Sequence, residues 1–61
     1  MSSKAEELLS KLKAEYESSQ TKYFDSMFYI GYDDSVLIEL HNEGYINIVD
    51  DVVGSIELLV E

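Results

Sequence analysis

The 61-residue sequence contains no cysteine, and this absence removes two common supports of a small domain. Without cysteine the chain has neither disulfides nor a thiolate metal site. A domain of this size buries only about 60% of the surface of its unfolded chain, and its core rarely supplies more than about 3–5 kcal/mol. We therefore expect packing, self-association or a bound partner to support the fold, and a reducing, cytoplasmic location.

Long apolar runs are also missing. No segment approaches the roughly 18 consecutive apolar residues of a membrane span, and no apolar run near the start resembles a signal peptide. We expect a soluble protein with no membrane partner. Hydrophobic residues still make up 46% of the chain, with five tyrosines, which favours one folded domain over residues 1–61 and argues against disorder.

Residues that carry catalysis are scarce. His41 is the one histidine, and the sequence has no Gly-rich phosphate loop, nucleophile elbow or H-E-x-x-H motif. We expect His41 to be an exposed residue at a strand end. Hard oxygen ligands occur in three places but lack the order of a calcium loop: Asp33 and Asp34, Asn42 and Glu43, and Asp50 and Asp51. The sequence thus predicts a protein that is not an enzyme, with no catalytic residue, no metal site and no cofactor.

Residues 3–20 have the pattern of an amphipathic helix. Ser3 and Glu6 have the spacing of a capping box, in which two amides at the helix start gain side-chain partners. Apolar side chains then recur every three or four residues and define one face: Ala5, Leu8, Leu9, Leu12 and Tyr16. Serine and threonine within residues 18–21 lower helix propensity, so we expect the helix to end near Gln20.

From residue 27 onward the apolar period changes to two, which is typical of strands with one buried face. Four segments show it, all at even-numbered positions: Phe28, Ile30 and Tyr32; Val36, Ile38 and Leu40; Ile46 and Ile48; Ile56, Leu58 and Val60. Residues 33–34 suit a hairpin turn, and Gly44 suits the bulge position of the next loop. Residues 50–54 form either a tight turn with a Gly54 bulge or a loop. The sequence predicts an α+β fold, with one N-terminal helix packed on a four-stranded antiparallel meander.

The charge is divided unevenly along the chain. In residues 1–22 four lysines balance four glutamates, whereas residues 23–61 hold nine carboxylates and no lysine or arginine, so this part carries the whole net charge of −9. Such a surface repels nucleic acid and attracts a basic cleft, and proteins with basic clefts mostly hold phosphate backbones. The alternative interpretation is that the acids only keep the protein soluble.

In being short, acidic, free of cysteine and built from a helix and antiparallel strands, the chain is similar to the small acidic inhibitors of phages and mobile elements, such as uracil-DNA glycosylase inhibitor. This resemblance is compositional and assigns no residue a role. We expect a protein-binding inhibitor or modulator that blocks a basic nucleic-acid-handling protein by nucleic-acid mimicry and does not itself bind nucleic acid. The candidate partner-binding residues are the acids and two tyrosines of this half: Asp33, Asp34, Glu39, Glu43, Asp50, Asp51, Glu57, Tyr29 and Tyr45.

A second hypothesis concerns self-association. The odd-numbered face of the predicted sheet carries Leu37, Val49 and Leu59, which an isolated monomer would leave exposed. These residues are the candidate interface of a homodimer or of a structural accessory module. In either case, repulsion among the carboxylates predicts raised pKa values in the folded state, and hence greater stability on moderate acidification.

Overall fold

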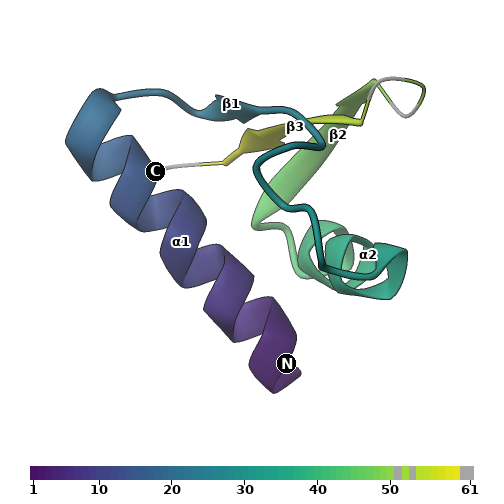
Figure 1. The fold of residues 1–61 in the computed structure, drawn as a ribbon. Coiled ribbons are helices and arrows are strands. Elements are labelled where there is room, and N and C mark those ends of the chain that lie inside the picture. Colours follow the sequence, from purple (N-terminus) through teal and green to yellow (C-terminus); the bar gives the residue numbers. More distant parts are fainter. Residues whose placement is uncertain (51, 53, 60–61) are drawn as a thin grey trace.

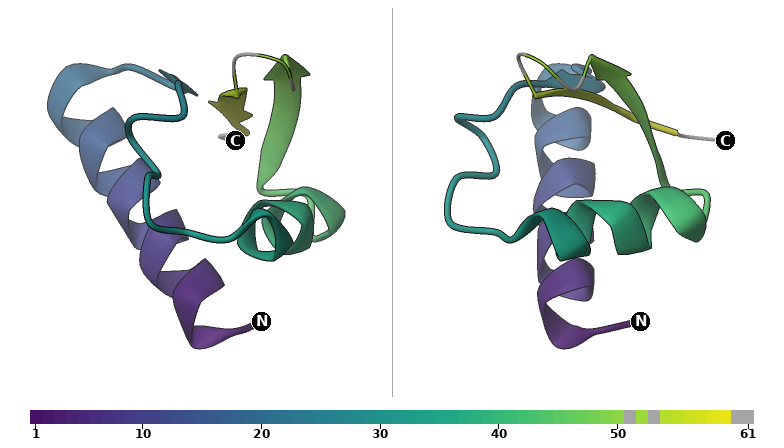
Figure 2. Two further views of the ribbon diagram at one scale, coloured as in Figure 1. Left: turned by 45° about the vertical axis from the view of Figure 1, so that its right-hand side comes forward. Right: turned by 90° about the vertical axis from the view of Figure 1, so that its right-hand side faces the viewer.

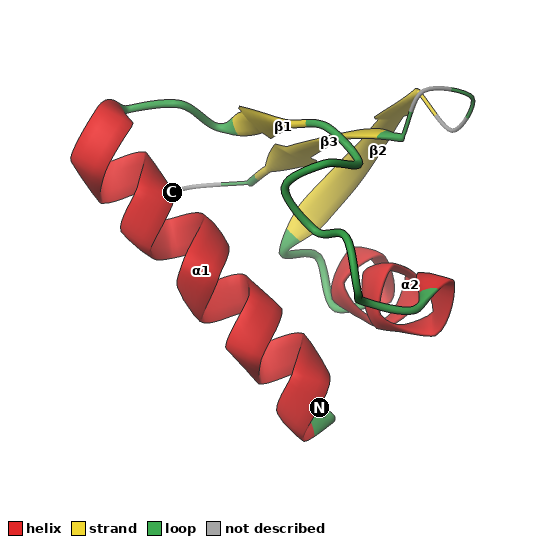
Figure 3. Cartoon of the chain, viewed as in Figure 1, coloured by secondary structure: helices red, strands yellow, loops and turns green. Residues whose placement is uncertain are grey.

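The computed structural model describes residues 1–50, 52 and 54–59 of the chain. In these residues two helices and three strands follow one another: α1 (Ser3–Ser19), β1 (Tyr23–Phe24), α2 (Asp34–Asn42), β2 (Ile46–Asp50) and β3 (Ser55–Leu58). The strands form an antiparallel sheet in the spatial order β1-β3-β2 (Figures 1 and 3). Helix α2 lies across one face of this sheet, and α1 passes beside both (Figure 2).

The predicted N-terminal helix is confirmed as α1, with its N-cap shifted by one residue. Ser2, rather than Ser3, is the N-cap, and its Oγ accepts a hydrogen bond from the amide of Ala5 at 3.2 Å. At the other end Gln20 takes a left-handed conformation with φ 62°, and its amide donates to the carbonyl of Tyr16. The apolar face packs inward as expected, since Ala5, Leu8, Leu9 and Leu12 are all buried.

The predicted strands around Ile46 and Ile56 are also confirmed, as the antiparallel pair β2 and β3. Ile46 lies opposite Leu58, and Ile48 lies opposite Ile56, so these apolar residues share one face of the sheet. Strand β2 contains a register irregularity between Ile48 and Asp50, and Gly54, just before β3, has a positive φ of 79°. Asp51 and Val60 lie outside the described residues.

The four-stranded meander is wrong, first because residues 27–32 form turns. The side chain of Asp25 accepts a hydrogen bond from the amide of Met27, which starts a turn in place of an extended strand. Further along, Gly31 has a φ of 96°. The alternation in this segment therefore does not separate a buried face from an exposed one. Ile30 is 74% exposed, although its even position predicts burial.

The meander is wrong, second, because Val36, Ile38 and Leu40 belong to helix α2. Val36, Leu37 and Leu40 are spaced three and four residues apart and are all buried, whereas Ile38 is 52% exposed. Two backbone hydrogen bonds, from Gly44 to the carbonyl of His41 and from Tyr45 to that of Leu40, end the helix in a Schellman motif. Gly44, at φ 84°, is therefore a helix C-terminal residue and not part of a hairpin loop.

The hydrophobic core lies where α1, α2 and the inner face of the sheet meet. Its six most completely buried large side chains come from four elements: Leu8, Leu12, Leu40, Ile46, Ile56 and Leu58. The short strand β1, which periodicity did not predict, contributes Phe24 and pairs with the central strand β3. Because β3 is central, β1 and β2 form the two edges of the sheet.

Candidate functional site

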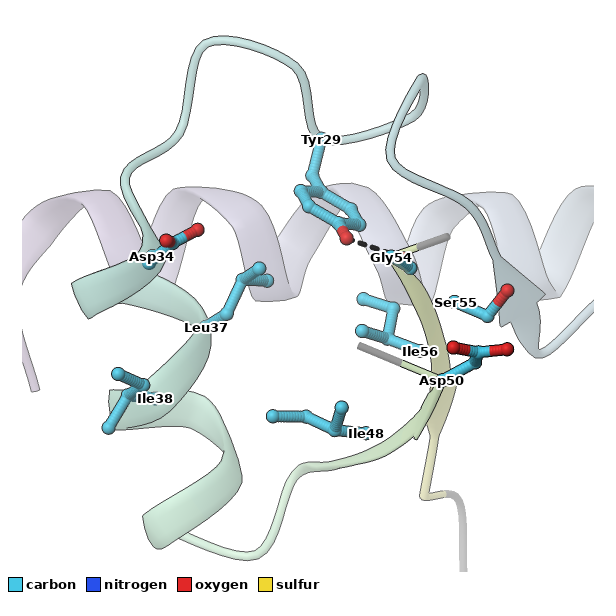
Figure 4. A pocket seen from close by; sticks show the side chains of 9 residues that line it. All are labelled: Tyr29, Asp34, Leu37, Ile38, Ile48, Asp50, Gly54, Ser55 and Ile56. Atoms are coloured by element: carbon cyan, nitrogen blue, oxygen red, sulfur yellow. Dashed lines mark hydrogen bonds between the residues drawn. The ribbon is translucent and has the colours of Figure 1, made fainter. Parts of the chain in front are cut away.

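A pocket of about 230 Å³ lies between helix α2 and strands β2 and β3 (Figure 4). Its floor is apolar, with Leu37 and Ile38 on the helix side and Ile48 and Ile56 on the strand side. The remaining lining residues are polar or small and lie around this floor: Tyr29, Asp34, Asp50, Gly54 and Ser55. The pocket thus joins an apolar base to a polar rim.

One wall of the pocket depends on a contact between Tyr29 and Gly54. The Tyr29 hydroxyl donates a hydrogen bond to the Gly54 carbonyl, which ties the turn after β1 to the start of β3 (Figure 4). A Cβ atom added at Gly54 would lie 2.7 Å from this hydroxyl and 2.9 Å from Cβ of Ser26. Burial, with smaller contributions from the negative charges of Asp34 and Asp25, raises the pKa of the Tyr29 phenol, which therefore stays protonated as a donor.

Asp34 and Asp50 supply the charge of the rim and come from opposite sides of the pocket. Asp34 lies in the first turn of α2, where the helix dipole favours a carboxylate. Asp50 ends β2, and one of its oxygens accepts a hydrogen bond from the amide of Val52 at 2.9 Å. No lysine belongs to the residues that line this pocket. The rim is therefore anionic with no cation of its own.

The four lysines of the chain are occupied elsewhere. Each lies over an aromatic ring, with Nζ 5.4–6.0 Å from the ring centroid: Lys4 and Lys11 over Tyr32, Lys13 over Tyr45, and Lys22 over Tyr23. At these distances a cation–π attraction holds the ammonium groups near α1 and β1. The charge division of the sequence is therefore kept only in part in space, because Lys22 pairs with Glu57 and Lys13 shares a hollow with Glu43.

The structure brings together only part of the predicted partner-binding set. Tyr29, Asp34 and Asp50 meet at the pocket, although Tyr29 is buried and presents its hydroxyl to Gly54. Asp33 is the exposed N-cap residue of α2 and has no place in the pocket lining. Asp51 lies outside the described residues.

The remaining predicted acids have other partners or positions. Glu39 accepts a hydrogen bond from the Ser2 amide at 2.6 Å, and Glu57 forms an ion pair with Lys22 at 3.7 Å. Glu43 and Tyr45 line a second hollow, of about 540 Å³, beside the C-terminal half of α1. This hollow includes Lys13 in its lining, so its charge is mixed.

The predicted oligomer interface is also divided. Leu37 is buried between α2 and the sheet and does not lie on an exposed face, because residue 37 is helical. Val49 and Leu59 are about half exposed, at 51% and 45%. Tyr23, which lies opposite Glu57 in the register, adds a further exposed aromatic ring to this side of the sheet.

Among the carboxyl groups of the described residues, two have displaced pKa values, and both move opposite to the direction that repulsion predicts. The hydrogen bond from Tyr32, together with the charge of Lys4, lowers the pKa of Glu7. Hydrogen bonds from the backbone and side chain of Ser2 lower the pKa of Glu39. For these two groups, local donors outweigh the surrounding negative charge.

Among the described residues, no three histidine, aspartate or glutamate side chains gather closely enough to hold a metal ion. His41 lies in the last turn of α2, not at a strand end, and its Nδ1 lies 3.3 Å from the carbonyl oxygen of Ile46. Neither described helix has both the length and the apolar character that crossing a bilayer requires.

Sequence reasoning missed the apolar floor of the pocket. Alternation predicts Ile38 and Ile48 on the buried face of one sheet, whereas they line the pocket from two different elements, helix α2 and strand β2 (Figure 4). The signal that was available is the burial spacing of Val36, Leu37 and Leu40, which leaves Ile38 on the margin of the helix face.

Comparison with protein-family models, with curated proteins and with solved structures finds no match to this chain. The functional interpretation therefore depends on the geometry of the site.

Proposed function

We propose that the chain is a protein-binding inhibitor that engages a basic surface of a nucleic-acid-handling protein through the anionic pocket between α2 and the β2–β3 hairpin. The observation that carries this proposal is the placement of Asp34 and Asp50 on opposite sides of an apolar floor whose lining has no lysine. The partner is a protein with a basic surface, and the chain itself does not bind nucleic acid.

The chemistry of the pocket suits a lysine or arginine side chain. Such a side chain has an apolar stem, which packs on apolar surface, and a charged head, which seeks an anion or water. Ile38 and Ile48 offer the apolar surface, and Asp34 and Asp50 offer the anions. The wider charge of −9 adds long-range attraction, which raises association rates and falls with salt.

Binding to such a basic surface would inhibit the partner because the partner uses the same surface to hold phosphate backbones. A protein that holds nucleic acid does so with clustered lysines and arginines, and an anionic surface that occupies them excludes the nucleic acid. In this chain the lysines lie over rings near α1 and β1 and do not screen the pocket. The anionic pocket is therefore free to face a basic cleft.

The test uses a labelled probe peptide, acetyl-Thr-Lys-Val-Lys-Val-Lys-Thr-amide, and fluorescence anisotropy. The native chain should bind the peptide, more tightly at about 20 mM than at about 150 mM salt. The double variant Asp34→Asn/Asp50→Asn should bind about tenfold more weakly, which corresponds to about 1.4 kcal/mol. Asparagine keeps the acceptor oxygen that bonds to Val52, so the turn survives while the charge is lost.

The matched control is Glu15→Gln/Glu17→Gln, which removes the same charge from the exposed face of α1. It should bind the peptide nearly as well as the native chain. Equal losses in the two double variants would show that net charge alone drives binding, and would contradict the proposal. Thermal melting of both variants checks that they remain folded.

Self-association remains a second candidate function, because Tyr23, Val49 and Leu59 are exposed. Light scattering at tens of micromolar protein should then give a dimer mass that Val49→Glu reduces to that of a monomer. A monomer mass for the native chain would rule this candidate out.

A further inference from the structure

Strand β2 forms an open edge of the sheet. It pairs with β3 on one side, and no described segment lies along its other side in either view of Figure 2. The amide of Leu59 donates to the carbonyl of Tyr45, so Tyr45 and Leu59 are a hydrogen-bonded pair of the antiparallel ladder. In an antiparallel pair the residues next to a hydrogen-bonded pair turn their backbone groups the other way. Ile46 and Ile48 therefore direct their N–H and C=O groups to the open edge, where Nδ1 of His41 lies 3.3 Å from the carbonyl oxygen of Ile46.

This edge has only some of the features that protect exposed strands, namely a short length and an irregularity near its end. Natural edges are protected by charged side chains, especially lysine, by proline, by bulges or by short length, because unpaired backbone groups otherwise recruit a further strand. The sequence of β2, Ile-Asn-Ile-Val-Asp, contains neither lysine nor proline, and its one irregularity comes only after Ile48. Two of its side chains are apolar and exposed, Ile48 at 38% and Val49 at 51%. The edge is therefore suited to accepting a strand.

The open edge and the anionic pocket share Ile48. Side chains of a strand added beside β2 would lie about 4.5–5.5 Å from their neighbours on the same face. On the face that Ile48 shares with the pocket, such side chains would cover Ile48 and the exposed Ile38 of α2. Long cationic side chains next to them come within reach of Asp34 and Asp50, which flank this floor.

The negative charge of the chain determines which kind of strand can bind at this edge. A second copy of β2 would bring a second Asp50 to the edge and would join two chains that each carry −9. A strand with lysine or arginine side chains would instead lie beside the opposite charge of Asp50. Charge complementarity therefore favours an extended basic segment of a partner protein over a second copy of this chain.

We propose that β2 binds the partner by strand addition: an extended basic segment pairs with the outward N–H and C=O groups of Ile48 and with the amide of Ile46, whose carbonyl His41 contacts, and places its side chains over the pocket. This inference rests on the proposed function and specifies how the partner is held. Backbone hydrogen bonds contribute affinity in this mode, and side-chain pockets contribute specificity.

The experiment compares the probe peptide described above with two N-methylated versions, each methylated at alternate residues so that one edge loses its N–H donors. Side chains and charge are unchanged. Strand addition predicts that at least one methylated peptide binds at least about tenfold more weakly than its parent, which corresponds to about 1.4 kcal/mol. Hydrogen exchange at the Ile48 amide should slow when the parent peptide binds, whereas that of Glu57, in the central strand, should not change.

The outcomes separate this inference from the proposed function. If the parent and both methylated peptides bind equally while Asp34→Asn/Asp50→Asn weakens all three, the anionic pocket is confirmed and strand addition is overturned. If the parent peptide does not bind, both proposals fail. The Ile48 amide of the chain without peptide could also be protected from exchange to a degree that rises with the fraction of dimer measured by light scattering. In that case a second copy occupies the edge and the inference is overturned.

Discussion

The contact between Tyr29 and Gly54 predicts that Gly54→Ala is far more destabilising than the same change at Gly44. Both glycines have a positive φ, 79° and 84°, so both alanine variants carry a backbone penalty of about 1–2 kcal/mol. At Gly44 a new Cβ meets nothing within 4 Å, whereas at Gly54 it meets the Tyr29 hydroxyl and Ser26 Cβ. Only Gly54→Ala therefore disturbs packing.

The additional destabilisation has two parts. Displacing the Tyr29 hydroxyl breaks its hydrogen bond to the Gly54 carbonyl, at about 0.5–1.5 kcal/mol, and crowding against Ser26 adds about 1–3 kcal/mol. Together they make Gly54→Ala about 1.5–4.5 kcal/mol less stable than Gly44→Ala. Because a domain of this size rarely has more than about 3–5 kcal/mol in total, Gly54→Ala should be close to unfolding.

Urea denaturation followed by circular dichroism measures the difference. Gly44→Ala should keep a cooperative transition at a lower midpoint, and Gly54→Ala should show little native baseline. In the Gly54→Ala background, Tyr29→Phe should restore part of the stability, because it removes the hydroxyl that the new Cβ meets at 2.7 Å. Equal midpoints for the two alanine variants would refute the packing of this pocket wall.

Three further predictions concern stability. The pKa values of Glu7 and Glu39 are lowered in the folded state, so both groups stabilise the fold at pH values above their ordinary pKa of 4.5. This stability is lost as the pH falls through the folded pKa values, and urea midpoints should therefore decrease below about pH 4.5. An increase on acidification would show that repulsion dominates instead. Leu40→Ala should destabilise the fold by about 2–5 kcal/mol, whereas Ile38→Ala, at a half-exposed site, should leave the urea midpoint nearly unchanged. Ser2→Ala should reduce stability by about 1 kcal/mol, and a thermal melt that matches the native one would exclude its role as the helix cap.

The parts of the fold that could be predicted are those where only one period fits the sequence. Helix α1 has a single apolar stripe and a capping signal, and its boundaries were correct to within one or two residues. The pairing of Ile46 and Ile48 with Leu58 and Ile56 follows from alternation around a turn. In both regions local pattern and tertiary packing agree.

Residues 33–44 could not be resolved in this way because two structures fit them. Val36, Ile38 and Leu40 alternate as in a strand, while Val36, Leu37 and Leu40 are spaced as in a helix. Gly44 suits either a hairpin bulge or a helix C-terminus. The helix prevails because it buries Leu37 as well as Val36 and Leu40, and a strand would leave Leu37 on the opposite face.

The candidate site was predictable only in its charge. Asp34 and Asp50 were identified from the uneven charge distribution, but the apolar floor between them depends on the long-range placement of α2 against β2. Tyr29, a candidate partner-binding residue, is buried, because its hydroxyl contacts the carbonyl of Gly54, 25 residues away in sequence. Periodicity contains no information about such a contact.

The most direct test of the anionic pocket is a titration of the isotopically labelled chain with the probe peptide, followed by amide chemical shifts. The account predicts that the largest shift changes occur at the pocket and its edge, at Asp34, Ile38, Ile48 and Asp50. Changes spread evenly over the exposed acids, or centred on Glu43 and Tyr45 at the second hollow, would contradict it.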